Sequence, residues 1–131
     1  MLTLMQNNCT LLIIDISNID IVEIIMAREQ LKNLTEPMYY ILLALSEPQH
    51  GYGIMQEVER HTDGRVKIGA GTLYNLLSRF EEENFIVQIS EENRRKIYTL
   101  TDKGLDILIE EYKRLKQLVS DGSDFLGGRV Q

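Results

Sequence analysis

The order of the predicted secondary-structure elements constrains the fold of this chain more than any single motif does. Apolar residues recur at the i, i+3, i+4 and i+7 positions of a buried helix face in residues 38–45 and again in residues 73–80. A shorter helix is expected between them, from about residue 53 to residue 61, with Asp63 and Gly64 ending it. Residues 65–70 suit a short strand or an extended link. The pattern predicts three short helices that face one core.

Residues with capping preferences support these boundaries. Thr35 precedes Glu36 and Pro37, which is a favourable N-cap followed by a proline whose missing N–H costs nothing in the first turn. The third helix is expected from about residue 71 to residue 83, and Asn84 can adopt the left-handed conformation that closes a helix. Gly51, together with a proline three residues earlier, is expected to separate the first two helices.

Two runs of β-forming residues, 85–90 and 95–100, flank a short polar segment and predict a β-hairpin. Thr101 and Asp102 then start a helix that we expect to run to about residue 120, before a frayed tail. The predicted fold class is mostly α with a small β-hairpin wing, a winged helix-turn-helix plus a C-terminal dimerisation helix. The expected divisions are a partly helical N-terminal extension without an assigned function (1–33), a winged helix DNA-binding domain (34–101), and the dimerisation helix with its tail (102–131).

Apolar residues of the last helix are spaced alternately by three and four positions, which is a heptad seam of about two heptads. Two interpretations are open: the helix packs on its own domain, or it pairs with the same helix of a second copy. Ile107 and Ile109 add apolar surface away from the seam, which favours the dimer. The expected dimer interface consists of Leu105, Leu108, Tyr112, Leu115 and Val119.

Composition argues against several classes of protein. The single cysteine, Cys9, rules out an intramolecular disulfide and a multi-cysteine zinc site, and two histidines leave little for a metal centre. We therefore expect no cofactor. The apolar runs are too short to span a bilayer, and the N-terminus lacks the pattern of a signal peptide, so the expected location is the cytoplasm.

The net charge of −6 disfavours nucleic-acid binding unless the basic residues are concentrated in one place. Residues 64–103 are the only segment with a basic excess, seven basic against six acidic side chains. Arg94, Arg95 and Lys96 are the densest basic run and lie at the predicted hairpin tip, where they can neutralise phosphates. The alternative is a solvated turn balanced by the acidic residues just before it. We favour the phosphate contact.

The polar face of the third helix is the second candidate for DNA contact. An α-helix fits the major groove, and hydroxyl, amide, guanidinium and phenol groups can read base edges or bind phosphates. Every soluble helix has a polar face, so this pattern alone does not establish DNA binding. The acidic triplet 81–83 has to stay clear of DNA, which leaves the N-terminal half of the helix for recognition. The candidate contacts are Thr72, Tyr74, Asn75, Ser78 and Arg79.

Three motifs in this order resemble the PadR family of bacterial transcriptional regulators. They are GYGI at 51–54, GTLY at 71–74 with its following apolar face, and RRKIYTLTDKG at 94–104. The resemblance covers about residues 34–118. It implies a winged helix domain, a homodimer formed through the C-terminal helix, and repression of a nearby gene by binding an inverted repeat in double-stranded DNA. It also implies release by a small aromatic or drug-like effector.

The resemblance assigns Thr72 and Tyr74 to the start of the recognition helix that approaches DNA, and the basic run 94–96 to the wing. Tyr52 matches a tyrosine that opens the second helix. Asn75 stands where the family commonly has proline, and Asn84 where it commonly has glycine. The chain has no tryptophan, so an effector site built on stacked tryptophans is not supported, and we assign no effector-binding residue.

Two other classes of function are alternatives to a DNA-binding regulator. A winged-helix protein-interaction module without DNA binding is favoured by the acidic total and by the triplet 81–83. An enzyme is disfavoured, since no phosphate-binding glycine loop, zinc-ligand spacing or nucleophile–base pair is found. His50 lies in a predicted turn and is expected to be a surface residue, whereas His61 lies on an apolar helix side and is expected to belong to the core.

Overall fold

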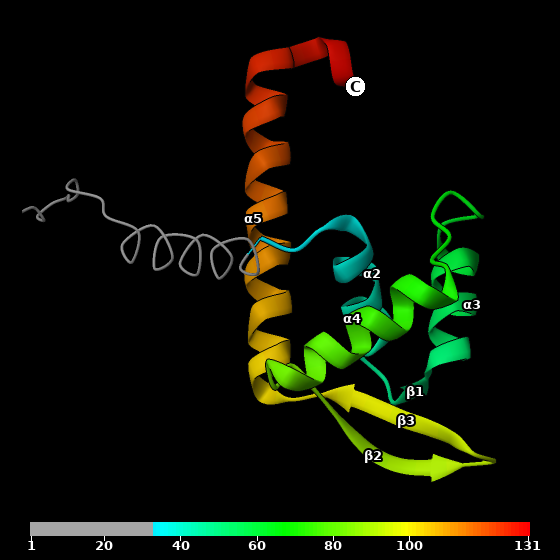
Figure 1. Ribbon diagram of the computed structural model, residues 1–131. Helices are drawn as coiled ribbons and strands as arrows, with labels where there is room; N and C mark the ends of the chain where they lie inside the picture. Colours follow the sequence, from blue (N-terminus) through cyan, green and yellow to red (C-terminus); the bar gives the residue numbers. More distant parts are fainter. Residues whose placement is uncertain (1–32) are drawn as a thin grey trace, which may run out of the picture. The chain divides into compact units, whose positions relative to one another are not determined.

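The computed structural model describes residues 33–131, so the expectation of a helical N-terminal extension falls almost entirely outside the described residues. Figure 1 shows a small helical body with a hairpin and a long last helix. The elements in chain order are α2 (Glu36–Ala44), β1 (Gln49–His50), α3 (Gly51–His61), α4 (Ala70–Glu82), β2 (Ile86–Glu92), β3 (Arg95–Leu100), α5 (Asp102–Leu126) and a 3-10 turn, η2 (Gly127–Val130). This order confirms the winged-helix fold class predicted from the sequence.

Side-chain caps start three of the helices. The Thr35 hydroxyl accepts from the Met38 N–H at the start of α2 (3.4 Å), and the Thr101 hydroxyl accepts from the Gly104 N–H at the start of α5 (3.0 Å). The cap of α3 was not foreseen: His50 Nδ1 accepts from the Gly53 N–H at 3.0 Å. Because of this cap, α3 begins at Gly51, two residues before the expected start, and Gly51 belongs to the helix instead of interrupting it.

The wing is a three-stranded antiparallel sheet in the order β1-β3-β2, one strand more than predicted. The additional strand β1 places Gln49 opposite Tyr98 and His50 opposite Ile97. Residues 93 and 94 form the hairpin turn with φ angles of 51° and 66°, the left-handed conformation at both central positions that a type I′ turn requires. Residues 66–69 carry no strand, so of the two alternatives for this segment the extended link is observed.

The core of the described unit lies among α2, α3 and α4, where the predicted apolar faces meet. Leu76 is the exception on its face and is only half-buried. His61 is exposed, with 63% of its side-chain surface accessible, so its assignment to the core was wrong. It pairs with Glu57 on the solvent side of α3. The fully buried apolar side chains are Ile41, Leu42, Leu45, Ile54, Leu73, Leu77 and Phe80.

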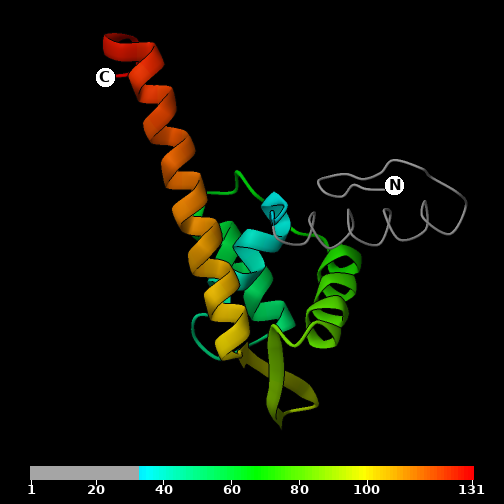
Figure 2. The same ribbon diagram turned by 90° about the vertical axis from the view of Figure 1, so that its left-hand side faces the viewer.

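Helix α5 is longer than predicted and continues to Leu126, through most of the segment expected to be frayed. Gly127, with a φ of 58°, ends it in a conformation that favours glycine. Figures 1 and 2 show the C-terminal half of α5 extending past the helices of the body. The N-terminal half packs on the body, where the backbone of Phe85 lies so close to Gly104 that a Cβ would overlap its carbonyl group.

Candidate nucleic-acid interface

The outward face of α4 carries the five residues that the sequence predicted as DNA contacts. Burial of Leu73, Leu77 and Phe80 on the opposite face turns these side chains toward solvent, because successive residues of a helix are 100° apart. Tyr74 is 51% exposed and lies beside the start of α3. All five are exposed: Thr72, Tyr74, Asn75, Ser78 and Arg79.

The three predicted wing cations are also exposed. Arg94 occupies the second position of the hairpin turn, a left-handed position where glycine is the usual residue. The guanidinium of Arg95 lies 5.7 Å from the centre of the Tyr52 ring, and its Nη1 lies 3.4 Å from His50 Nε2. Within residues 33–131, no carboxylate forms a salt bridge with Arg94, Arg95 or Lys96, so the described acidic residues leave these charges unneutralised.

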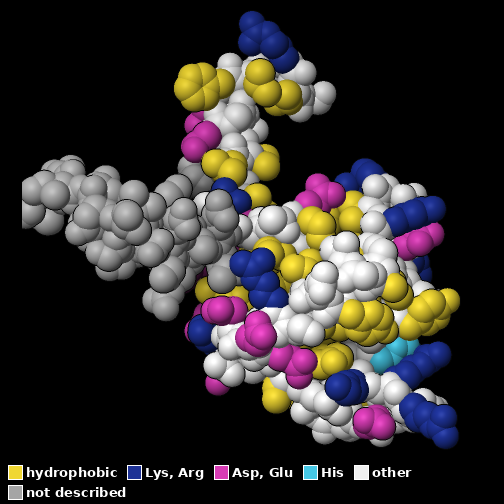
Figure 3. All heavy atoms as spheres, viewed as in Figure 1, with side chains coloured by type: hydrophobic (Ala, Val, Ile, Leu, Met, Phe, Trp, Pro, Cys, Tyr) yellow, Lys and Arg dark blue, Asp and Glu magenta, His cyan; other side chains and the backbone are white. Residues whose placement is uncertain are grey.

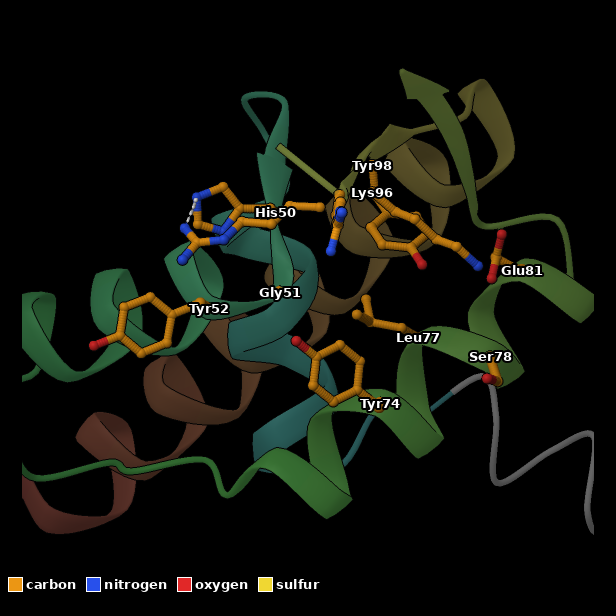
Figure 4. A pocket seen from close by; sticks show the side chains of 11 residues that line it. His50, Gly51, Tyr52, Tyr74, Leu77, Ser78, Glu81, Lys96 and Tyr98 are labelled. Carbon is orange, nitrogen blue, oxygen red and sulfur yellow. Dashed lines mark hydrogen bonds between the residues drawn. The ribbon is translucent and has the colours of Figure 1, made fainter. Parts of the chain in front are cut away.

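A cleft of about 370 Å³ joins the start of α3, the outward side of α4 and the wing. Figure 4 shows Tyr74, Ser78 and Glu81 of α4 facing residues of α3 and β3 across this cleft, which we call the wing cleft. It brings together five of the eight predicted DNA contacts. The residues that line the wing cleft are His50, Gly51, Tyr52, Tyr74, Leu77, Ser78, Glu81, Arg94, Arg95, Lys96 and Tyr98.

The remaining predicted contacts lie outside the wing cleft. Thr72 lines a second, smaller cleft of about 250 Å³ together with Arg65 and Lys67. Asn75 and Arg79 lie on the outward face of α4 but line neither cleft. The five predicted contacts on α4 therefore form one helix face, of which one side borders the wing and the other side borders the link before α4.

Charge in the wing cleft is opposite in sign to that of the whole chain. Three cations and one carboxylate, Glu81, line it, whereas the net charge of the chain is −6. Figure 3 shows Lys and Arg side chains gathered around the hairpin end at the lower right, with histidine beside them. Glu81 departs from expectation, because the acidic triplet was expected to lie clear of the binding surface.

Six residues that line the wing cleft were not among the predicted DNA contacts: His50, Gly51, Tyr52, Leu77, Glu81 and Tyr98. Tyr98 is buried, with 6% of its surface exposed. Burial raises the pKa of Tyr98 above its ordinary value, and the negative charge of Glu81 and the phenol of Tyr74 raise it further. The glycines of the GYG motif are a signal that could have indicated this region, since close backbone approach is a usual reason for glycine, but Gly51 was interpreted as a helix breaker.

The predicted dimer residues on α5 fall into two groups. Leu108 is buried inside its own protomer, 5% exposed, and Leu115 is half-buried. Leu105, Tyr112 and Val119 are exposed. The same helix exposes further large apolar side chains beyond the seam, namely Ile109, Leu118, Phe125 and Leu126.

In residues 33–131, no helix has the length and apolar character needed to cross a membrane. The same residues contain no group of three or more His, Cys, Asp or Glu side chains placed to hold a metal ion.

Comparison with solved structures finds the same fold in regulators of known family. A PadR family transcriptional regulator from Eggerthella lenta is 25% identical, with a TM-score of 0.60 over 87% of this chain and 99% of that one. A PadR-like transcriptional regulator from Bacillus cereus is 26% identical, with a TM-score of 0.56 over 79% of this chain and 97% of that one.

Comparison by sequence agrees with the structures. An uncharacterized 37.1 kDa protein in a transposon of Streptomyces fradiae is 32% identical over 79 residues, which are 60% of this chain and 22% of that protein. The model of the transcriptional regulator PadR-like family matches residues 41–110, more than half of the chain and nearly all of the winged helix. The chain therefore belongs to the PadR-like family of transcriptional regulators, which bind DNA and are not enzymes.

Proposed function

We propose that this protein is a homodimeric repressor that binds an inverted repeat in double-stranded DNA and is released by a small aromatic or drug-like effector. The observation that carries the proposal is the wing cleft. An acidic protein concentrates three cations there, without salt bridges to the other described residues, beside the exposed start of its third helix. Electrostatic attraction to phosphates supplies most of the sequence-independent affinity for DNA.

In this proposal the outward face of α4 enters the major groove. Thr72, Asn75 and Arg79 face outward on one side of the helix, where amide and guanidinium groups can read base edges. Tyr74 and Ser78 border the wing cleft, where hydroxyl groups suit phosphate oxygens. The basic run 94–96 binds the neighbouring backbone, and Arg94 at the turn reaches farthest along the duplex.

The dimer is proposed to form through α5. Its 25 residues give a helix about 37 Å long, and large apolar side chains are exposed along it. Two recognition helices that read one face of DNA have to be about 34 Å apart. A pair of long α5 helices can set such a spacing, and burial of their apolar side chains would stabilise the pair.

DNA binding is tested by fluorescence anisotropy with a duplex from the upstream region of the protein's own gene, titrated at several salt concentrations. We expect the logarithm of the association constant to fall linearly with the logarithm of the salt concentration. The triple variant Arg94→Ala/Arg95→Ala/Lys96→Ala should bind at least tenfold more weakly and with a smaller salt slope. No binding of this duplex by the wild type at low salt rejects the proposal.

A matched control removes the same number of charges elsewhere. Lys113→Ala/Lys116→Ala/Arg129→Ala changes α5 and η2, outside the wing cleft, and should keep the wild-type salt slope. If the wing variant binds as tightly as this control, the wing is not at the DNA. In that case a protein-interaction role of the wing cleft becomes the better account.

A further inference from the structure

The side chain of His50 meets two hydrogen-bond donors but can accept from only one of them. Nδ1 lies 3.0 Å from the Gly53 N–H, and Nε2 lies 3.4 Å from Arg95 Nη1. The dashed line in Figure 4 marks the second contact. A neutral imidazole has a single acceptor nitrogen, and a guanidinium has donors only. The two contacts therefore compete for one lone pair.

The helix cap takes that lone pair. The Gly53 N–H lies in the first turn of α3, where no carbonyl of the helix can accept from it, and its distance to His50 is the shorter of the two. Nδ1 is then the acceptor, and the proton lies on Nε2. As a result, the Nε2–H of His50 and an N–H of Arg95 are two donors that face each other without an acceptor between them.

Such a pair of donors is suited to an oxygen anion. Both groups line the wing cleft, and the guanidinium is held at its other side by the Tyr52 ring. Within residues 33–131, no carboxylate lies within salt-bridge distance of Arg95. An anionic oxygen placed between the two donors would accept from both, so both hydrogen bonds would be charge-assisted, and the one from Arg95 would join opposite charges.

We propose that His50 and Arg95 together bind one non-bridging phosphate oxygen, with His50 donating from Nε2. The inference rests on the proposed DNA binding and adds a residue to it: His50 contacts the sugar–phosphate backbone directly, while its other nitrogen starts the helix that carries Tyr52. The oxygen belongs to a phosphodiester of the duplex, because the wing cleft opens between α4 and the wing.

The tautomer gives a test that does not depend on DNA. A long-range ¹⁵N–¹H correlation spectrum of the free protein at mildly alkaline pH identifies which ring nitrogen of His50 carries the proton. We expect the Nε2–H form. The Nδ1–H form would mean that His50 accepts from Arg95, and it would overturn the proposal whatever the affinity for DNA.

Two substitutions separate the phosphate contact from the helix cap. His50→Asn keeps an oxygen that can accept from the Gly53 N–H, but its side chain is too short to reach the position of Nε2. His50→Gln places an N–H donor near that position but is a poor cap. We expect His50→Asn to melt like the wild type and to bind DNA about tenfold more weakly. We expect His50→Gln to melt about 5 °C lower and to keep the affinity within about threefold.

Either of two results contradicts this assignment: wild-type affinity in His50→Asn, or a loss in His50→Gln as large as in His50→Asn. A double-mutant cycle adds a test of the shared oxygen. In an Arg95→Ala background, His50→Asn should cost less than threefold, because the phosphate has already lost its stronger partner. In the control background Arg79→Ala, which lies outside the wing cleft, it should still cost about tenfold. Equal losses in the two backgrounds would overturn the proposal.

A separate experiment distinguishes failure of the proposed DNA binding from failure of the phosphate site. If the wild type binds no duplex, titration with inorganic phosphate is followed through the His50 ring resonances. Shifts in the wild type that are absent in Arg95→Ala identify a site for free phosphate and reject the duplex as its source. No shift in either protein, together with no DNA binding, rejects the phosphate site itself.

Discussion

The hydroxyl of Tyr74 lies so close to Gly51 that a Cβ on this glycine would be 2.7 Å from the phenol oxygen. Figure 4 shows the two residues facing each other across the wing cleft, one on α4 and the other at the start of α3. The absence of a side chain at position 51 therefore allows the phenol of Tyr74 to lie where it does. The glycine in α3 thus affects the surface through which α4 is proposed to bind DNA.

Gly51→Ala should displace Tyr74 and weaken DNA binding while the fold persists. The atoms that a Cβ meets belong to the end of a side chain, which can rotate away, and alanine is the better helix former by about 1 kcal/mol. We expect the free energy of unfolding to change by less than about 1 kcal/mol and the affinity to fall about tenfold, the value of one hydrogen bond to a phosphate. Urea unfolding and anisotropy measure the two effects.

The control for this substitution is Gly122→Ala in α5, where a Cβ meets nothing within 4 Å. It should raise stability slightly and leave the affinity unchanged. Equal affinities of the Gly51 and Gly122 variants would show that DNA binding does not depend on the position of Tyr74.

Gly104→Ala is the contrasting case, because the neighbouring atoms belong to the backbone. A Cβ there would overlap the carbonyl group of Phe85, which also accepts from the Thr101 N–H and cannot swing aside. We expect a loss of about 2–3 kcal/mol in the free energy of unfolding, typical of overpacking. Urea unfolding measures this loss, with Gly122→Ala as the control for helix propensity. A stability equal to that control would mean that α5 can shift away from Phe85 without cost.

Ionisation of Tyr98 reports the electrostatics of the wing cleft. Burial, the charge of Glu81 and the phenol of Tyr74 raise the pKa of Tyr98. The neutral phenol therefore contributes stability below the unfolded pKa of about 10, and this contribution is lost as the pH rises through the higher folded pKa. Glu81→Gln should lower the pKa of Tyr98 but leave it above the ordinary value, because burial is the larger cause.

The titration of Tyr98 can be followed by the ¹³Cζ chemical shift of labelled tyrosine. The matched control is Glu82→Gln, which removes a charge one residue further along α4 and outside the wing cleft. A shift of the same size in both variants would mean that the general negative charge of α4, not Glu81, acts on Tyr98.

The helices and the hairpin could be predicted because their signals are local. Apolar spacing identified the faces that carry Ile41 and Leu73, and Asn84, with a φ of 62°, closes α4 as its residue type suggested. The tail was misjudged because its glycines, serines and aspartates are weak helix formers. Helix α5 nevertheless runs on to Leu126, where Gly127 ends it.

The assembly of the candidate site was not predictable in the same way. Strand β1 has only two residues and exists because β3, far along the chain, provides its hydrogen-bond partners. The role of His50 as a cap has no strong sequence signal, since the preferred capping residues are Ser, Thr, Asp and Asn. The contact between Arg95 and His50 spans 45 positions, a distance at which periodicity carries no information.

An ion pair on α5 between a buried carboxylate and a partly exposed guanidinium leads to the fourth prediction. The side chain of Glu111 is 1% exposed, and Arg114 donates to both of its carboxylate oxygens at 2.8 and 2.6 Å. Glu111 in turn raises the pKa of Arg114. Arg114→Ala should lower the free energy of unfolding by about 3 kcal/mol, because it leaves a buried carboxylate without a partner.

The double variant Glu111→Leu/Arg114→Ala tests that explanation of the loss. It removes the stranded charge and should regain most of the stability, since apolar residues often replace a buried ion pair without loss. Thermal unfolding of the two variants and the wild type measures the difference. A double variant as unstable as Arg114→Ala would show that the arginine stabilises the protein by packing, not by neutralising Glu111.

The last prediction concerns the dimer that is proposed to form through α5. Val119 is 69% exposed in the protomer, so Val119→Glu should leave the fold and the melting of the protomer intact. If α5 is the interface, a carboxylate at this seam position should dissociate the dimer, as measured by sedimentation velocity. DNA affinity should then fall about a hundredfold or more, because the second half-site is no longer held near its partner. Ser120→Glu adds the same charge at a neighbouring exposed position outside the predicted seam, and it should leave both properties unchanged. A Val119→Glu protein that stays dimeric and binds DNA like this control would place the interface elsewhere.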